Sequence, residues 1–287
     1  MSLKKYLSKL DDLQGKKVIV TGGTSGIGLS IVKHLLFFNA HVVILARNEN
    51  KAMKVKQSLL EKYPQGAVDF VKYDQSDDQS VIKACEEIAS KHANFYALIM
   101  NAGIFQSKKK QTRVDDIYCT IKTNYVGLGL FIKTILEMIK GKHRYIFQGS
   151  FVAGYHLKKI KSLQDKDIST WQQYLISKSG VESLYYHYSN NDSSSFYLVE
   201  PGLTNSDIIR DFPSFIRGLG HLFMKTVSHS TDKAALTAIY ALQKDVAPCY
   251  IVPRGLLTFM GYPKIKAFPE KRRRQYLYDL LDQTKKC

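Results

Sequence analysis

Short apolar runs alternate with longer amphipathic stretches along the first part of the chain. Residues 17–21 form a β-rich run that leads into several glycines. The apolar positions that follow repeat with the spacing of a helix: Ile27, Ile31, Val32, Leu35 and Leu36. The next run, residues 41–45, is continuously apolar after its first residue, which is typical of a buried parallel strand. The pattern therefore predicts a strand, a glycine-rich turn, a helix and a second strand.

The same alternation continues to about residue 252. It predicts helices over 49–63, 77–92, 114–139, 171–188 and 231–242, and strands over 68–71, 95–100, 144–148, 196–199 and 250–252. Strands that alternate with helices require right-handed crossovers and a parallel sheet covered on both faces. We therefore expect an α/β fold, a Rossmann-type doubly wound parallel sheet in a single domain over residues 15–252. Residues 1–14 form a short N-terminal extension, and residues 253–287 a basic C-terminal extension.

Residues 203–230 break the alternation. Their apolar side chains cluster between 212 and 224 and are interrupted by Pro213 and by glycines. We interpret residues 203–230 as a substrate lid, because mobile segments of this kind commonly close over an active site.

The charge of the chain raises a competing class of function. The sequence of 287 residues has 42 Lys plus Arg against 25 Asp plus Glu, a formal net charge of +17. Such an excess favours nucleic acids, anionic membranes or phosphorylated ligands. The basic residues are spread out apart from 108–110 and 271–274, and neither cluster lies in a nucleic-acid-binding motif. We expect a solvated basic surface and no specific nucleic acid; a basic peripheral membrane or nucleic-acid-binding protein is the alternative.

The N-terminus and the cysteines point to a cytoplasmic protein. Residues 1–10 lack the uninterrupted apolar stretch of a signal peptide. No run reaches the roughly 18 apolar residues of a spanning helix, so no transmembrane segment is expected. The four cysteines are scattered, without the close pairs that mark a zinc site or a redox dithiol, so no metal site is predicted.

A glycine-rich turn gives the first candidate site. Residues 21–28 read Thr-Gly-Gly-Thr-Ser-Gly-Ile-Gly and lie between a predicted strand and a predicted helix. Glycines allow a tight turn and a close backbone approach, while the amide groups and dipole of the helix face an anionic pyrophosphate. The predicted cofactor contacts here are Gly22, Thr24, Ser25, Gly26, Ile27 and Gly28. The other interpretation is a simple strand-to-helix loop.

Arg47 indicates which nicotinamide cofactor the site favours. About 20 residues after the turn, a site for NAD places Asp or Glu at the end of the second strand. This chain has Ala46 and Arg47 there. An arginine removes the carboxylate that would repel a 2′-phosphate and supplies a planar cation that can bind it. We therefore predict NADP(H) in preference to NAD(H); the alternative is that Arg47 is an ordinary surface residue.

Together with further motifs, the turn makes residues 15–252 resemble the short-chain dehydrogenase/reductase family. The motifs are the Thr21–Gly28 turn, Asn101-Ala102-Gly103, Asn124, Ser150, Tyr174-Leu-Ile-Ser-Lys178 and Pro201-Gly202. Because Tyr174 and Lys178 are four residues apart on a predicted helix, their side chains share one face. The resemblance implies an NADP(H)-dependent oxidoreductase that transfers a hydride between nicotinamide and a carbonyl or alcohol substrate.

The resemblance also implies roles for four residues in proton transfer. Tyr174 would act as the general acid or base, and Lys178 would lower the pKa of the phenol by its charge and bind the nicotinamide ribose. Ser150, at the end of a predicted strand, would hold the substrate oxygen. Asn124 would kink its helix and support a proton-relay water. An intact set of these residues disfavours a catalytically idle NADP-binding regulatory protein, an alternative that the fold alone leaves open.

Binding roles are implied for the remaining motif residues. Asn101, Ala102 and Gly103 would line the adenine ribose, Asp74 would hold the adenine amino group, and Pro201, Gly202 and Thr204 would contact the nicotinamide carboxamide. For Asp74, capping of a turn is an equally good interpretation.

The resemblance extends loosely to a branch of the family. The 24 residues from Ser150 to Tyr174 exceed the usual gap and resemble the retinol-dehydrogenase-like branch, which often takes lipophilic substrates. Gly149, where that branch has a second serine, departs from its pattern. We expect a small-molecule carbonyl or alcohol substrate of lipophilic character. A homo-oligomer is also expected, because the family commonly associates through the helices that carry Asn124 and Tyr174.

Overall fold

The computed structural model describes residues 2–154, 160–189, 194–204, 230–255 and 260–284. Its centre is an eight-stranded sheet in the order β10-β9-β8-β7-β4-β1-β2-β3, parallel throughout except for the antiparallel pairing of β9 and β10. The strands are β1 (Lys17–Thr21), β2 (His41–Ala46), β3 (Ala67–Lys72), β4 (Ala97–Met100), β7 (Arg144–Gln148), β8 (Ser195–Val199), β9 (Tyr250–Pro253) and β10 (Pro263–Lys266). The single α/β domain predicted from the sequence is confirmed.

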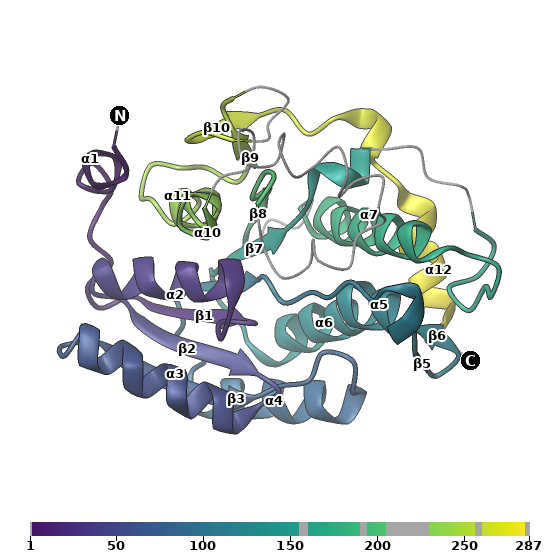
Figure 1. Cartoon of the computed structure of the whole chain (residues 1–287), viewed down its shortest axis with the longest axis horizontal. Helices are drawn as coiled ribbons and strands as arrows, with labels where there is room; N and C mark the ends of the chain where they lie inside the picture. Colours follow the sequence, from purple (N-terminus) through teal and green to yellow (C-terminus); the bar gives the residue numbers. More distant parts are fainter. Residues whose placement is uncertain (1, 155–159, 190–193, 205–229, 256–259, 285–287) are drawn as a thin grey trace.

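Helices cover both faces of the sheet (Figure 1). The apolar core on one face includes residues of α2 (Gly26–Phe37), α3 (Glu49–Lys62), α11 (Leu236–Tyr240) and the short α1 (Leu3–Leu7), with α10 (Thr231–Ala234) packed beside α2. The core on the other face includes α4 (Asp78–Lys91), α6 (Leu128–Met138), α7 (Thr170–Tyr188) and α12 (Gln275–Thr284).

Side-chain caps explain where several helices begin. Asn48 accepts a hydrogen bond from the Lys51 amide at the start of α3, and Asp77 accepts from two amides at the start of α4. These caps satisfy amide groups that have no partner within the first turn. The observed starts at residues 49 and 78 agree closely with the predicted ones.

The helix predicted over 114–139 is wrong in its first residues. A hairpin of β5 (Arg113–Val114) and β6 (Ile117–Tyr118) precedes α5 (Cys119–Ile121) and a π-helical turn, η2 (Lys122–Gly127), which continues into α6. Asp115 and Asp116 have φ angles of 50° and 59°. This left-handed pair closes the hairpin and cannot belong to a helix.

The described part of the C-terminal extension packs against the rest of the domain. β10 extends the sheet, and α12 lies alongside α7 (Figure 1). Leu277 and Leu281 of α12 are buried in the same core as α6 and α7. Of the predicted lid, only residues 203, 204 and 230 lie within the described residues.

The described residues contain neither a membrane-spanning helix nor a cluster of potential metal ligands. None of their helices has both the length and the apolar character needed to cross a membrane. No group of three or more His, Cys, Asp or Glu side chains among them is placed to hold a metal ion.

Candidate active site

A cleft of about 450 Å³ opens at the carboxyl ends of the parallel strands. This is the edge of an open α/β sheet at which ligands usually bind. Every site residue predicted from the sequence lines the cleft except Asn124. The structure thus brings together the glycine-rich turn, Arg47, Asp74, residues 101–103, the residues Ser150, Tyr174 and Lys178, and the segment 201–204.

The glycine-rich turn is fixed to the end of β4. The hydroxyl of Thr21 accepts a hydrogen bond from the Ala102 amide at 2.9 Å, and the Thr21 carbonyl accepts one from Asn101 Nδ2 at 3.0 Å. Gly22 has a φ of 71°, and a Cβ on Gly28 would overlap the Gly22 carbonyl. The turn therefore requires glycine at these two positions, and it leaves bare backbone facing the cleft.

The first turn of α2 presents its amide groups at this end of the cleft. Its N-cap residue, Ser25, is extended and makes no side-chain hydrogen bond to the helix. The first amides of a helix lack partners within it, and together with the helix dipole they attract anions. This arrangement suits the pyrophosphate of a dinucleotide.

Arg47 and Asp74 lie on the same side of the cleft, after β2 and β3. Arg47 is exposed. Asp74 Oδ1 accepts hydrogen bonds from the amide of Ser76 at 3.0 Å and from its hydroxyl at 2.7 Å. Asp74 therefore caps a turn while also lining the cleft.

Tyr174, Ser150 and Lys178 meet at the opposite end. α7 carries Tyr174 and Lys178 one turn apart, and Ser150 follows β7; all three side chains are buried. Burial raises the pKa of Tyr174 to about 12, and a hydrogen bond with the Ser150 side chain opposes this shift. Tyr174 is therefore protonated near neutral pH and can donate a proton to a neighbouring oxygen.

Lys178 lies beneath this pair with its ammonium group against β7. Nζ donates to the carbonyl of Gln148 at 3.3 Å. Burial lowers the pKa of Lys178 to about 8, and the charge of Glu182, one helical turn later, opposes this. A buried lysine whose pKa is close to neutral can exchange its proton readily, which is common at functional sites.

Asn124 supports the site without lining the cleft. It lies in the π-helical turn η2, where Oδ1 accepts from the Ile104 amide at 2.7 Å and Nδ2 donates to the Ile104 carbonyl at 2.8 Å. Nδ2 also donates to the hydroxyl of Ser177 at 3.1 Å. Asn124 thereby ties the loop after β4 to the helix that carries Tyr174 and Lys178.

An apolar wall adjoins Tyr174, and the sequence prediction missed it. Phe105 and Phe151 line the cleft, and Phe151 and Trp171 pack against a small buried cluster that contains Phe105 and Tyr174. The ring of Phe105 meets the ring of Tyr174 edge-on, with 5.4 Å between centroids. Phe105 follows residues 101–103 closely and Phe151 comes directly after Ser150, which is the signal that could have identified them.

Two polar side chains in the cleft have buried atoms without a partner. Both amide atoms of Gln148 and the hydroxyl of Thr204 are buried and lack a hydrogen bond among the described residues. Buried polar atoms are nearly always paired in native proteins, so these atoms suit a bound molecule that has polar groups.

The short chain dehydrogenase family model matches residues 16–214 of the chain. Among its relatives, polyprenol dehydrogenase of Danio rerio is 27% identical over 247 residues, which cover 82% of this chain and 76% of the relative. Polyprenol dehydrogenase of Homo sapiens is 28% identical over 241 residues, covering 78% of this chain and 71% of the relative.

Solved structures share the fold. A short-chain dehydrogenase/reductase from Serratia marcescens superposes with a TM-score of 0.64 at 21% identity, covering 83% of this chain and 96% of that one. A short chain dehydrogenase from Burkholderia cenocepacia in complex with NADP gives a TM-score of 0.61 at 21% identity, covering 82% and 93%. The chain therefore belongs to the short-chain dehydrogenase family, whose members are oxidoreductases that act on CH–OH groups with a nicotinamide cofactor.

Proposed function

We propose that this protein is an NADP(H)-dependent oxidoreductase that interconverts a carbonyl compound and its alcohol, with Tyr174 as the general acid and base. The meeting of Tyr174, Ser150 and Lys178 at one end of a cleft carries the proposal, because the other end offers the features of a dinucleotide site. NADP(H), when bound, supplies or accepts the hydride.

The residues of the cleft fit this cofactor. Gly22 and Gly28 leave the backbone bare for the close approach of a pyrophosphate, and the amides of α2 add partial positive charge. Arg47 offers a cation for a 2′-phosphate where Ala46 supplies no competing carboxylate. The unpaired atoms of Gln148 and Thr204 lie towards the other end and suit the nicotinamide carboxamide.

Proton transfer falls to the residues around Tyr174. The Ser150 hydroxyl holds the substrate oxygen beside the phenol, so that in reduction Tyr174 donates its proton to that oxygen. In oxidation the phenolate removes the alcohol proton. The Ser150 hydrogen bond favours the phenolate, and a positive charge on Lys178, one helical turn away, would favour it as well.

The apolar wall supports a lipophilic substrate. Phe105 and Phe151 border the place where the substrate carbon would lie, and Trp171 packs against the same small cluster, with its ring near that of Tyr174. Two relatives are named for their action on polyprenol, a long apolar alcohol. We propose an apolar alcohol or aldehyde whose oxygen reaches Ser150. The homo-oligomer and the cytoplasmic location remain predictions from the sequence.

The catalytic role is tested by NADPH oxidation with a panel of aldehydes and ketones that includes isoprenoid aldehydes. The wild type should turn over at least one compound, and Tyr174→Phe should lower kcat by roughly 10²–10⁴-fold, because the proton donor is lost. Tyr63→Phe, at the end of α3, serves as a matched control and should behave as the wild type. Equal rates for the wild type and Tyr174→Phe would refute the role of this phenol.

Cofactor preference is tested with Arg47→Ala. Loss of a charge-assisted contact to the 2′-phosphate should weaken NADPH binding roughly 10- to 100-fold and leave NADH binding unchanged. Fluorescence titration with both cofactors measures this, and Arg47→Lys should fall between the wild type and alanine. An unchanged ratio of the two affinities would remove Arg47 from the cofactor site.

A further inference from the structure

Two arginines of the basic cluster 271–274, Arg272 and Arg274, are directed into the molecule and not into solvent. Arg272, at the end of the short turn η6 (Glu270–Arg272), is only 7% exposed, although Lys271 and Arg273 on either side are exposed. Arg274 is half-buried. These side chains therefore do not form a uniform solvated patch.

The guanidinium of Arg272 joins four elements. Nε donates to Glu182 Oε2 at 2.9 Å, and Nη2 forms an ion pair with the other Glu182 oxygen. Nη2 also donates to Glu200 Oε1 at 2.6 Å, and Nη1 donates to the Tyr250 hydroxyl at 2.9 Å. The Tyr250 hydroxyl in turn donates to Glu200 at 2.6 Å. One buried cation is thus shared by α7, by the end of β8 and by β9. The carbonyl of Ser150, after β7, also accepts a hydrogen bond from Nη2 at 3.3 Å.

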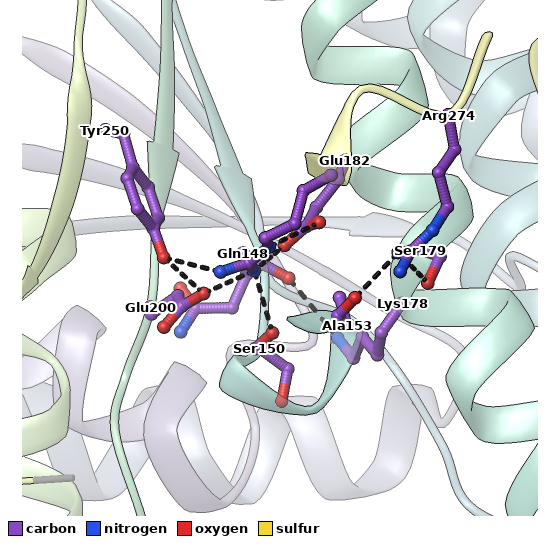
Figure 2. Close-up of polar contacts among 10 residues, drawn as sticks. Gln148, Ser150, Ala153, Lys178, Ser179, Glu182, Glu200, Tyr250 and Arg274 are labelled. Atoms are coloured by element: carbon purple, nitrogen blue, oxygen red, sulfur yellow. Dashed lines mark hydrogen bonds and ion pairs between the residues drawn. The ribbon is translucent and has the colours of Figure 1, made fainter. Parts of the chain in front are cut away.

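These contacts reach the residues of the active site directly. Glu182 lies four residues after Lys178 on the same face of α7 (Figure 2). Arg274 Nη1 donates to the Ala153 carbonyl at 2.6 Å and to the Ser179 hydroxyl at 2.8 Å. Figure 2 shows this second arginine linking the loop after Ser150 to α7. The C-terminal segment therefore clamps the serine loop to the helix of the tyrosine and the lysine.

We propose that Arg272 is a positioning residue for the reaction: it holds the Ser150 backbone and balances the charge of Glu182 and Glu200 beneath Lys178. The proposal rests on the proposed function of Tyr174 and Lys178. The buried carboxylates of Glu182 and Glu200 both pair with the buried Arg272. The positive charges of Lys178 and of the half-buried Arg274 also act on Glu182.

The direction of the pKa shifts supports this coupling. Burial raises the pKa of Glu182 to about 7, and the hydrogen bond and charge of Arg272 oppose that rise. Burial lowers the pKa of Lys178 to about 8, and the charge of Glu182 opposes that fall. Arg272 thus acts on Lys178 through Glu182. Among the described residues, the charge of Glu182 acts on Lys178, and Tyr174 lies one helical turn before it. The charged groups that act on Glu182 in turn are Arg272, Glu200 and Arg274, and Tyr250 contacts both Glu200 and Arg272.

A merely structural ion pair is the competing explanation, and the titration of Lys178 separates the two. Without Arg272, Glu182 takes up a proton more easily and its negative charge no longer supports the ammonium group, so Lys178 should release its proton more easily in Arg272→Met. Glu182→Gln removes the same negative charge directly, so its shift should have the same direction. A structural role predicts lower stability in both variants and no shift.

The test follows alcohol oxidation with NADP⁺ as a function of pH. We expect the rise in rate to move to lower pH in both Arg272→Met and Glu182→Gln, since this limb reports the titration of the Tyr174–Lys178 pair. In Arg272→Met, kcat at neutral pH should fall roughly 10-fold or more while NADPH affinity changes less than about 3-fold, because the Arg272 contacts lie away from the glycine-rich turn. Arg272→Lys should recover part of the loss.

Arg273→Met is the matched control, because this neighbouring side chain is exposed and pairs with Glu270 at the surface. Its profile should equal that of the wild type. A shift to higher pH in Arg272→Met, or no shift in either variant, would overturn the proposal. If Arg272→Met does not fold, Glu182→Gln and Arg272→Lys decide: a Glu182→Gln profile that stays at the wild-type pH overturns it.

A second readout separates this proposal from the proposed function. The pH dependence of Lys178 acetylation, followed by peptide mass spectrometry, needs no turnover. It should shift to lower pH in both variants. Absence of turnover in the wild type would count against the proposed function alone, whereas unshifted acetylation profiles would count against the role of Arg272.

Discussion

The two ends of the cleft are formed by different kinds of chemical group. The cofactor end is formed mainly by backbone: Gly22 and Gly28 have no side chains to fill the space, and the first amides of α2 face the cleft. At the catalytic end, four buried ionisable side chains lie behind Tyr174 and Ser150: Lys178, Glu182, Glu200 and Arg272. A site formed by backbone groups depends on the local conformation of the chain. A site formed by charged side chains depends on partners that are distant in the sequence.

This difference decides which changes each end tolerates. Arg272 and Glu182 are 90 residues apart in the sequence, and Arg272 reaches the site only because the C-terminal segment is docked on α7. Damage to that docking should therefore affect the catalytic end, while the glycine-rich turn should respond only to changes in its own backbone.

The largest effect is expected from Leu277→Ala. Leu277 is fully buried in the core beside α6 and α7, and its carbonyl accepts a hydrogen bond from the Tyr125 hydroxyl at 2.5 Å. Removing the side chain should cost about 3 kcal/mol of unfolding free energy, as for other large cavities in a core. Urea unfolding measures this loss. Leu280→Ala, at a half-buried position of the same helix, should cost about 1 kcal/mol. If both substitutions left the unfolding free energy nearly unchanged, α12 would not be packed on the core as described.

A smaller effect, confined to the cofactor end, is expected from Gly28→Ala. The new Cβ would overlap the Gly22 carbonyl, so the turn must shift, at a cost of roughly 1–3 kcal/mol. NADPH affinity should fall roughly 10-fold or more, as measured by fluorescence titration. Gly26→Ala is the matched comparison, because its Cβ would meet no atom within 4 Å but its φ is +53°. That strain should cost only about 1 kcal/mol. Tighter NADPH binding by Gly28→Ala than by Gly26→Ala would contradict the expectation that the overlap at residue 28 is more costly than the backbone strain at residue 26.

The sequence was most informative where one element is determined by its own residues. The predicted strands 17–21 and 41–45 and the helix 49–63 agree closely with β1, β2 and α3, because buried parallel strands are continuous apolar runs and Asn48 marks a helix start. The motif residues of the candidate site, apart from Asn124, also line one cleft.

The sequence failed where a distant contact or one turn outweighs the local pattern. The left-handed conformation of Asp115 and Asp116 interrupts a stretch whose apolar spacing reads as a helix. Arg272 lies in a run of basic residues that normally indicates a solvated surface, and its partners cannot be identified from spacing. A periodic pattern predicts which face of an element is buried, but it does not predict which charge a buried carboxylate will find.

The smallest effect concerns the contact between α2 and α10, on the face of the sheet opposite to α7. Here the Ser30 hydroxyl donates to the Thr231 hydroxyl at 2.9 Å, and His34 Nε2 donates to the Asp232 carbonyl at 2.9 Å. Burial lowers the pKa of His34, with the Asp232 carbonyl and charge opposing. The folded state therefore binds this proton less tightly than the unfolded state. The resulting stability is present above the unfolded pKa of about 6.5 and is lost as the pH falls below it.

His34→Gln should accordingly reduce the drop in Tm between pH 7 and pH 5, as measured by circular dichroism at several pH values. The drop should not vanish, because burial also lowers the pKa of His92 and of His187, and these residues keep their part of the slope. A steeper drop in His34→Gln would mean that the folded protein prefers the charged imidazole. A charged His34 would then stabilise the contact between α2 and α10, as Arg272 stabilises the catalytic end. Charged side chains would in that case matter near the cofactor end too, and the contrast between the two ends of the cleft would not hold.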